Sequence, residues 1–201
     1  RLYTLTQEII NRSDKIIVMT SDSEEILRKT YKIFPGNKVV VIPHGIHPIM
    51  FQDSLSMKAR LGFTGRTVGL TFGLLSRNKG IEYILEALPD VVSVYPDFLY
   101  LIVGATHPAV KQREDEIYRK YLENLVKSLN LKKNVLFVNR FLPLKLLLSY
   151  IQASDICISC NLGLEQSVSG TLSYAMGSGR AVLATNFRQA MQFVTPEVGR
   201  L

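Results

Sequence analysis

The chain has 201 residues, 47% hydrophobic and 20% charged, so it can bury a core and fits one full domain plus part of another. Its 24 Lys and Arg against 17 acidic residues give a formal charge of +7, which favours anionic partners. The basic residues are spread, and the densest run, 127–133, contains no aromatic residue, so nucleic acid is not an expected partner. No apolar run approaches the roughly 20 residues of a membrane-spanning helix. The N-terminal residues lack the pattern of a secretion signal, which indicates a cytoplasmic protein.

Apolar runs with the length of strands alternate along the chain with amphipathic stretches typical of helices. The strand-like runs are 15–20, 38–42, 67–72, 98–103, 134–138, 155–159 and 181–185. The helical patterns are 22–33, 81–94, 110–130, 144–153 and 171–177. This alternation predicts an α/β fold, a Rossmann-like parallel sheet with helices on both faces.

The organisation of the chain changes at Pro43. Residues 43–56 contain proline, glycine and histidine without any period, which predicts a linker between two domains. Residues 1–42 hold too few elements for an independent domain and are expected to be the tail of an N-terminal domain. Residues 57–201 are expected to form a second domain that is truncated at its C-terminus.

Two segments have the residues of a phosphate site. In 71–80, TFGLLSRNKG, Gly73 permits a tight turn after a predicted strand, and Arg77 and Lys79 bring cations to the next helix. In 165–174, EQSVSGTLSY, Ser169, Gly170 and Thr171 are expected to begin a helix whose free N–H groups and positive dipole end can face an anion. Together they predict a nucleotide-type ligand.

Seven segments, in order and spacing, resemble the C-terminal half of family 4 glycosyltransferases, which are retaining enzymes of the GT-B fold. They are SDKIIVMTSDSEEILRK, VVVIPHGIHPIMF, TFGLLSRNKGIEYILEALP, LIVGATHP, NVLFVNRFLP, YIQASDICISC and EQSVSGTLSYAMGSGRAVLAT. The resemblance spans essentially the whole chain. It implies the donor-binding portion of an enzyme that moves a hexose from a nucleoside-diphosphate sugar to a sugar or lipid-linked acceptor, with retention of the anomeric configuration.

The resemblance also implies what the chain needs around it. Such enzymes generally require no metal or other cofactor, because side-chain cations and a helix end hold the diphosphate. Most of the acceptor site would lie outside this chain, so the chain alone is expected to be inactive. Peripheral contact with a membrane face is left open, since the missing half often provides it in related enzymes.

Individual roles follow from the resemblance. Gly73 and Lys79 would hold the donor diphosphate, and Lys79 would stabilise negative charge on the leaving group. The family's arginine after this glycine is replaced by Leu74. Either Arg77 supplies the second cation, or diphosphate binding is weaker.

The family's two site glutamates align with Gln166 and Tyr174, so the chain departs from the pattern at both positions. The first contacts the donor sugar, a role that Glu165 could take if the loop is one residue longer. The second grips the ribose hydroxyls and has no carboxylate substitute. Altered ribose contacts, a changed donor and reduced activity all remain open, as does a non-catalytic nucleotide-sugar or phosphate-binding module.

The family's base site corresponds to residues 139–142. Backbone groups at Asn139, Arg140 and Leu142 could pair with a base edge, and Phe141 could cover it. The alternative is a core phenylalanine beside a surface arginine.

Other conspicuous residues have structural explanations. His107 follows a strand, where ligands gather, but we expect it to cap a loop. Cys157 and Cys160 lie three apart on a predicted strand and so point to opposite faces, which argues against a zinc or redox pair. His44 and His47 have no acidic ligand nearby, so no metal site is expected.

Overall fold

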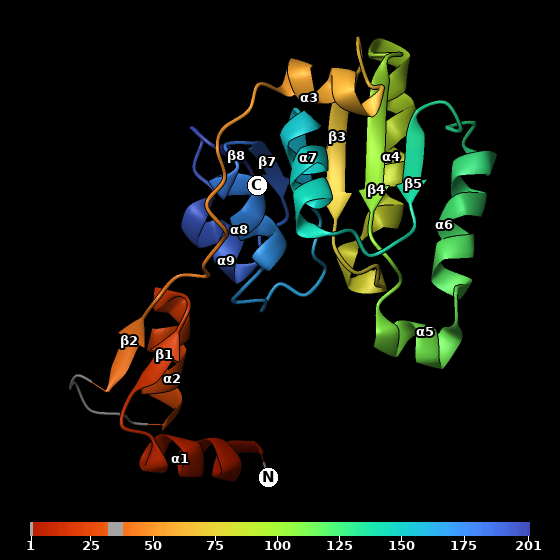
Figure 1. Cartoon of the computed structure of the whole chain (residues 1–201). Coiled ribbons are helices and arrows are strands. Elements are labelled where there is room, and N and C mark those ends of the chain that lie inside the picture. Colours follow the sequence, from red (N-terminus) through yellow and green to blue (C-terminus); the bar gives the residue numbers. More distant parts are fainter. Residues whose placement is uncertain (1, 32–37) are drawn as a thin grey trace.

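The computed structural model describes residues 2–31 and 38–201, as a small N-terminal unit followed by a larger α/β domain (Figure 1). The elements of the N-terminal unit are α1 (Leu2–Arg12), β1 (Ile16–Val18), α2 (Ser21–Tyr31) and β2 (Val39–Val41). Strands β1 and β2 pair in parallel, with Ile16 opposite Val39. The predicted helix 22–33 corresponds to α2, and its last two positions lie outside the described residues.

An extended segment, residues 42–53, leads from β2 past α8 to the larger domain. The elements of this domain are α3 (Ser54–Leu61), β3 (Thr67–Phe72), the 3-10 helix η1 (Arg77–Lys79), α4 (Ile81–Val94), β4 (Phe98–Val103), α5 (Pro108–Glu114), α6 (Ile117–Ser128), β5 (Val135–Val138), α7 (Leu144–Ala153), β6 (Ile156–Ser159), α8 (Gly170–Gly177), β7 (Ala181–Ala184), α9 (Arg188–Phe193) and β8 (Gly199–Arg200). None of the helices described is long and apolar enough to cross a membrane.

The described strands of the larger domain form one parallel sheet in the order β5-β4-β3-β6-β7-β8. The α/β prediction is therefore confirmed. From β3 the chain first adds β4 and β5 on one side, and then returns to add β6, β7 and β8 on the other. The strand order thus reverses between β3 and β6, and ligands of open α/β sheets bind outside the carboxyl ends of the strands at such a point.

Two hydrophobic cores cover the two faces of this sheet. The fully buried strand β4 serves both, because Leu101 points into one core and Tyr100 into the other. Helices α7, α8 and α9 pack with the first core, and α4 and α6 with the second. A continuous apolar run such as 98–103 is what a parallel strand buried on both faces requires.

Several elements differ from the sequence-based expectation. The predicted helix 110–130 is two helices, because Asp115 has a φ of 49°, which the α-helix does not allow. Helix α3 begins inside the predicted linker 43–56, where the Asp53 carboxylate accepts a hydrogen bond of 3.2 Å from the Ser56 N–H. Helices α1, α3 and α9, the 3-10 helix η1 and the short strand β8 were not predicted.

Candidate functional site

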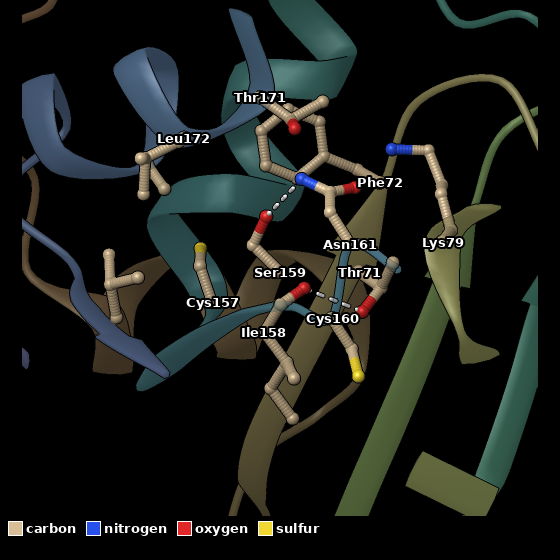
Figure 2. Close-up of a pocket in the computed structure, with 12 residues that line it drawn as sticks. Thr71, Phe72, Lys79, Cys157, Ile158, Ser159, Cys160, Asn161, Thr171 and Leu172 are labelled. Atoms are coloured by element: carbon tan, nitrogen blue, oxygen red, sulfur yellow. Dashed lines mark hydrogen bonds between the residues drawn. The ribbon is translucent and has the colours of Figure 1, made fainter. Parts of the chain in front are cut away.

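A narrow crevice opens at the carboxyl ends of β3 and β6, beside the start of α8 (Figure 2). Its polar lining includes Thr71, Lys79, Ser159, Asn161 and Thr171. The Thr71 hydroxyl donates to the Ile158 carbonyl at 2.8 Å, so it is already engaged. The enclosed space is only about 10 Å³, roughly what one water molecule needs. Any larger group therefore has to bind at the mouth of the crevice, where Lys79 and Thr171 lie.

Lys79 is a half-buried cation. Within the described ranges, no carboxylate forms an ion pair with it. Figure 2 shows its ammonium extended toward the side of the crevice on which Thr171 lies. Burial lowers the pKa of Lys79 below its ordinary value, because the charged form loses hydration. A cation held in this way can recover the lost stabilisation from an anionic ligand.

Gly73 brings the two phosphate-site segments of the sequence together. A β-carbon on Gly73 would lie 3.0 Å from Thr171 Cγ2 and 3.5 Å from Lys79 Nζ, so both side chains face this glycine. The φ of Gly73 is 104°, which other residues rarely adopt. The tight turn expected at this position is therefore present.

The start of α8 is held by its own cap. Ser169 is buried, and its hydroxyl accepts from the Leu172 N–H at 3.3 Å and shares a hydrogen bond with the Thr171 hydroxyl. The backbone N–H of Ser169 donates to Gln189 Oε1. Ser169 therefore builds the helix start, and the N–H groups of Gly170 and Thr171, the first in the helix, are the ones that can face an anion.

The predicted base-site residues line a second pocket next to Gly73. Arg140, Phe141 and Leu142 enclose a volume of about 110 Å³ together with Gly73 and Leu74. Phe141 is 81% exposed, so the alternative of a core phenylalanine is wrong. Gly73 separates this pocket from the crevice that contains Lys79, which places an aromatic surface and a cation on either side of one glycine.

Arg77 is not among the residues that line either pocket. Its Nη2 lies 3.0 Å from Glu114 Oε2, and its guanidinium stacks 5.0 Å from the centroid of the Tyr118 ring. The second cation expected from the sequence is therefore engaged with α5 and α6, while Leu74, at the family's arginine position, contributes an apolar wall.

The three residues considered for the sugar and ribose have partners within the chain. Glu165 is 82% exposed and pairs with Arg188, at 2.5 Å from Nη2 and 2.8 Å from Nε. Gln166 donates to the Val168 carbonyl at 3.0 Å. The Tyr174 hydroxyl lies 2.5 Å from His47 Nδ1. Their polar groups thus hold the loop before α8 and the extended segment 42–53 in place.

Three other conspicuous features of the sequence are His107, the two cysteines and the potential metal ligands. His107 caps α5 by accepting from the Ala109 N–H at 3.1 Å, which confirms the capping interpretation. Cys157 is buried and Cys160 is half-buried, and both thiols are free. No group of three or more potential metal ligands occurs among the described residues.

Sequence reasoning missed Arg188 and Gln189, which contact the loop before α8. They lie in α9, whose six residues are too few to show a helical period. It also missed Asn161, which lies two residues after the end of β6 and whose amide donates to the Ser159 hydroxyl at 3.4 Å.

Comparisons with known proteins identify the family that the chain resembles. A family model described as "Glycosyl transferases group 1" matches residues 66–200. An uncharacterized glycosyltransferase of Methanocaldococcus jannaschii (MJ1607) is 26% identical over 88% of this chain and 44% of its own length. Spore coat protein SA of Bacillus subtilis is 25% identical over 65% of this chain and 33% of its own length.

Solved structures show the same fold. Sucrose-phosphate synthase of Thermosynechococcus elongatus matches with a TM-score of 0.80 and 26% identity, over 99% of this chain and 47% of that one. HepE of Anabaena, solved in complex with UDP, matches with a TM-score of 0.78 and 20% identity, over 99% of this chain and 52% of that one. The chain therefore spans between a third and about a half of these relatives.

Proposed function

The chain belongs to the glycosyl transferases group 1 family, and from this premise we propose that it is the donor-binding portion of a retaining hexosyltransferase. The full enzyme would move a hexose from a nucleoside-diphosphate sugar to a sugar or lipid-linked acceptor. The observation that carries the proposal is the ammonium of Lys79, which has no carboxylate partner among the described residues and lies beside Gly73 and the start of α8. These groups offer positive charge at one point, as a diphosphate requires.

The two pockets give the donor an orientation. The diphosphate would lie at the mouth of the crevice, between Lys79 and Thr171, and the base would lie in the adjoining pocket against Phe141. When the glycosidic bond breaks, negative charge grows on the leaving diphosphate. An ammonium already fixed in a partly dehydrated crevice stabilises that charge without reorganising. Because Lys79 and the helix start supply this charge, the proposal includes no metal or other cofactor.

A second candidate is a non-catalytic nucleotide-sugar or phosphate-binding module. The observation in its favour is that Glu165 and Tyr174, at or next to the family's glutamate positions, are engaged by Arg188 and His47. Such a module would keep the Lys79 site and lack the groups that act on the sugar. The two candidates share donor binding and differ only in transfer.

Calorimetric titration tests the shared step. The chain is titrated with UDP, GDP and ADP and with their glucose and mannose conjugates, and the titrations are repeated with Lys79→Ala and Arg77→Ala. Both variants lose one cation from the same loop, but only Lys79 faces the crevice. We expect selective binding that falls at least about tenfold in Lys79→Ala and much less in Arg77→Ala. No binding by the unaltered chain, or equal losses in both variants, contradicts the proposed site.

Transfer is tested separately. We propose that most acceptor contacts lie outside this chain, so the 201-residue chain should bind a donor without transferring its sugar. Donor consumption and product are followed in the presence of candidate acceptors. Detectable turnover by this chain would show that the acceptor site is already complete.

A further inference from the structure

The first turn of α9 holds the loop between β6 and α8. The Arg188 N–H donates to the Leu164 carbonyl at 2.9 Å, and the Gln189 N–H donates to the Gln166 carbonyl at 3.3 Å. The buried side chain of Gln189 accepts from the N–H of Ser169, the cap of α8. Two neighbouring residues of α9 therefore fix the second part of this loop, residues 164–169, at three points.

The N-terminal unit reaches the same turn of α9. Arg188 Nη1 lies 3.1 Å and 3.3 Å from the two carboxylate oxygens of Asp22, at the start of α2. One turn further along α9, Gln192 Nε2 donates to the Ser21 hydroxyl at 2.6 Å. These contacts join residues 166 and 171 positions apart in the sequence. They connect α2 directly to the element that holds the loop.

One guanidinium therefore bridges two carboxylates from different parts of the chain. Nη1 of Arg188 faces Asp22, and the opposite edge, Nε and Nη2, faces Glu165. The guanidinium is planar and rigid, so fixing one edge fixes the direction of the other. Glu165 is 82% exposed, and an ion pair with so exposed a partner is weak unless the other group is already oriented. Asp22 supplies that orientation.

We propose that Arg188 is a positioning residue of the donor site, through which the docking of α2 sets the conformation of loop 164–169. The inference rests on the proposed function, because it takes the start of α8 to face the ligand. When Asp22 holds Arg188, the loop keeps Glu165 and the Ser169 cap in the arrangement described above. When Asp22 is absent, Arg188 loses its orientation and the loop becomes less ordered.

The charge-neutralising variant Asp22→Asn separates positioning from simple electrostatics. Asp22 lines neither the crevice nor the pocket next to Gly73. Removal of a negative charge would by itself strengthen the binding of an anion. If Asp22 acts by positioning Arg188, its loss weakens anion binding instead. Positioning and simple electrostatics therefore predict changes in ligand affinity of opposite sign.

The chain offers a matched control on the same helix. Glu25 pairs with Lys29 and has no ion pair with Arg188 among the described contacts, so Glu25→Gln removes the same charge and leaves the bridge intact. The probes are UDP and UDP-glucose, titrated calorimetrically into each variant of the 201-residue chain. We expect Asp22→Asn to bind UDP-glucose about two- to fivefold more weakly than Glu25→Gln. Asp22→Glu, which keeps a carboxylate for Arg188, should restore most of the affinity.

Amide hydrogen exchange gives a readout that does not depend on binding. Without ligand, the amides of 164–169 should exchange faster in Asp22→Asn than in Glu25→Gln. If the unaltered chain binds UDP-glucose but Asp22→Asn matches Glu25→Gln in both affinity and exchange, this inference is wrong and the proposed function stands. If the unaltered chain binds none of UDP, GDP, ADP and their glucose and mannose conjugates, the proposed function fails, and this inference fails with it; if it binds a GDP or ADP conjugate, that conjugate replaces UDP-glucose as the probe.

Discussion

Gly104 packs against Gly73 so closely that a β-carbon on Gly104 would lie 1.9 Å from the Gly73 carbonyl oxygen. The two glycines follow the neighbouring strands β4 and β3, and the Gly73 N–H donates to the Val103 carbonyl at 2.9 Å. Gly104 also has a φ of 148°, which L side chains rarely adopt. Gly73 lines the pocket with Phe141 and is faced by Lys79 and Thr171 of the crevice, so the geometry of both depends on the absence of a side chain at residue 104.

The variant Gly104→Ala should lose both stability and ligand binding. The added methyl group meets backbone that cannot move aside like a side chain, so we expect the free energy of unfolding to fall by about 2 kcal/mol or more. Urea denaturation gives that value, and titration with UDP shows whether the displaced Gly73 turn still binds. Gly45→Ala is the control, because a β-carbon there would have no neighbour within 4 Å. Equal stability of the two variants would contradict the close packing of the two strand ends.

Lys79→Met should bind UDP more weakly without lowering the stability of the fold. The ammonium of Lys79 has lost hydration and has no carboxylate partner in the described part of the chain, so it destabilises the fold, whereas methionine keeps most of the apolar stem. We expect UDP affinity to fall at least about tenfold. The free energy of unfolding should stay unchanged or rise by up to about 1 kcal/mol, since the crevice is partly open to water. A clearly destabilised Lys79→Met chain would mean that Lys79 has a structural role.

The lowered pKa of Lys79 predicts a dependence of stability on pH. Below this pKa the folded and unfolded chains both carry the proton, so the cost of the buried charge is present in full. Between this pKa and the ordinary lysine value of 10.5 the unfolded chain binds more protons, so stability rises with pH. The difference in unfolding free energy between the unaltered chain and Lys79→Met should therefore shrink as pH approaches 10.5. A constant difference across alkaline pH would show that Lys79 is not desolvated.

Strands buried on both faces could be predicted from the sequence because their apolar runs are continuous. The run 98–103 corresponds to β4 residue by residue, and 67–72 corresponds to β3. The short elements α9 and β8 could not be predicted, because segments of six and two residues are too short to show a periodic pattern. Helix α1 has a period, but in it only Ile10 is buried, so no core constrains its pattern.

The candidate site could be predicted only where parallel topology brings strand ends together. Gly73 and Lys79 follow β3, and Thr171 belongs to the helix after the adjacent strand β6, so their proximity follows from the fold. The pair His47–Tyr174 joins residues 127 positions apart, and Glu165–Arg188 joins residues 23 apart. No periodicity links the members of either pair. For this reason these contacts could not be predicted from the sequence, and Glu165 and Tyr174 were considered as residues that face a ligand.

The ion pair between Lys58 and Asp155 should hold α3 on the larger domain. The Lys58 side chain is 7% exposed, and its ammonium lies 2.7 Å and 2.6 Å from the two carboxylate oxygens of Asp155. Asp155 also accepts from the Val68 N–H at 2.6 Å, so one carboxylate connects α3 with β3. Lys58→Met would leave that carboxylate without its cation. Because Asp155 is 33% exposed and can gain water, we expect a loss of about 1–3 kcal/mol, below that for a fully buried pair.

Urea denaturation of Lys58→Met measures this loss, and Lys111→Met is the matched control. Lys111 pairs with Glu116 at 3.6 Å, but its side chain is 61% exposed, so its removal should change stability by less than about 0.5 kcal/mol. If both variants lose the same small amount, α3 docks through Met57 and its apolar neighbours alone. A larger loss in Lys58→Met would show that α3, which begins at Ser54 inside the predicted linker, is held to the larger domain by this buried ion pair.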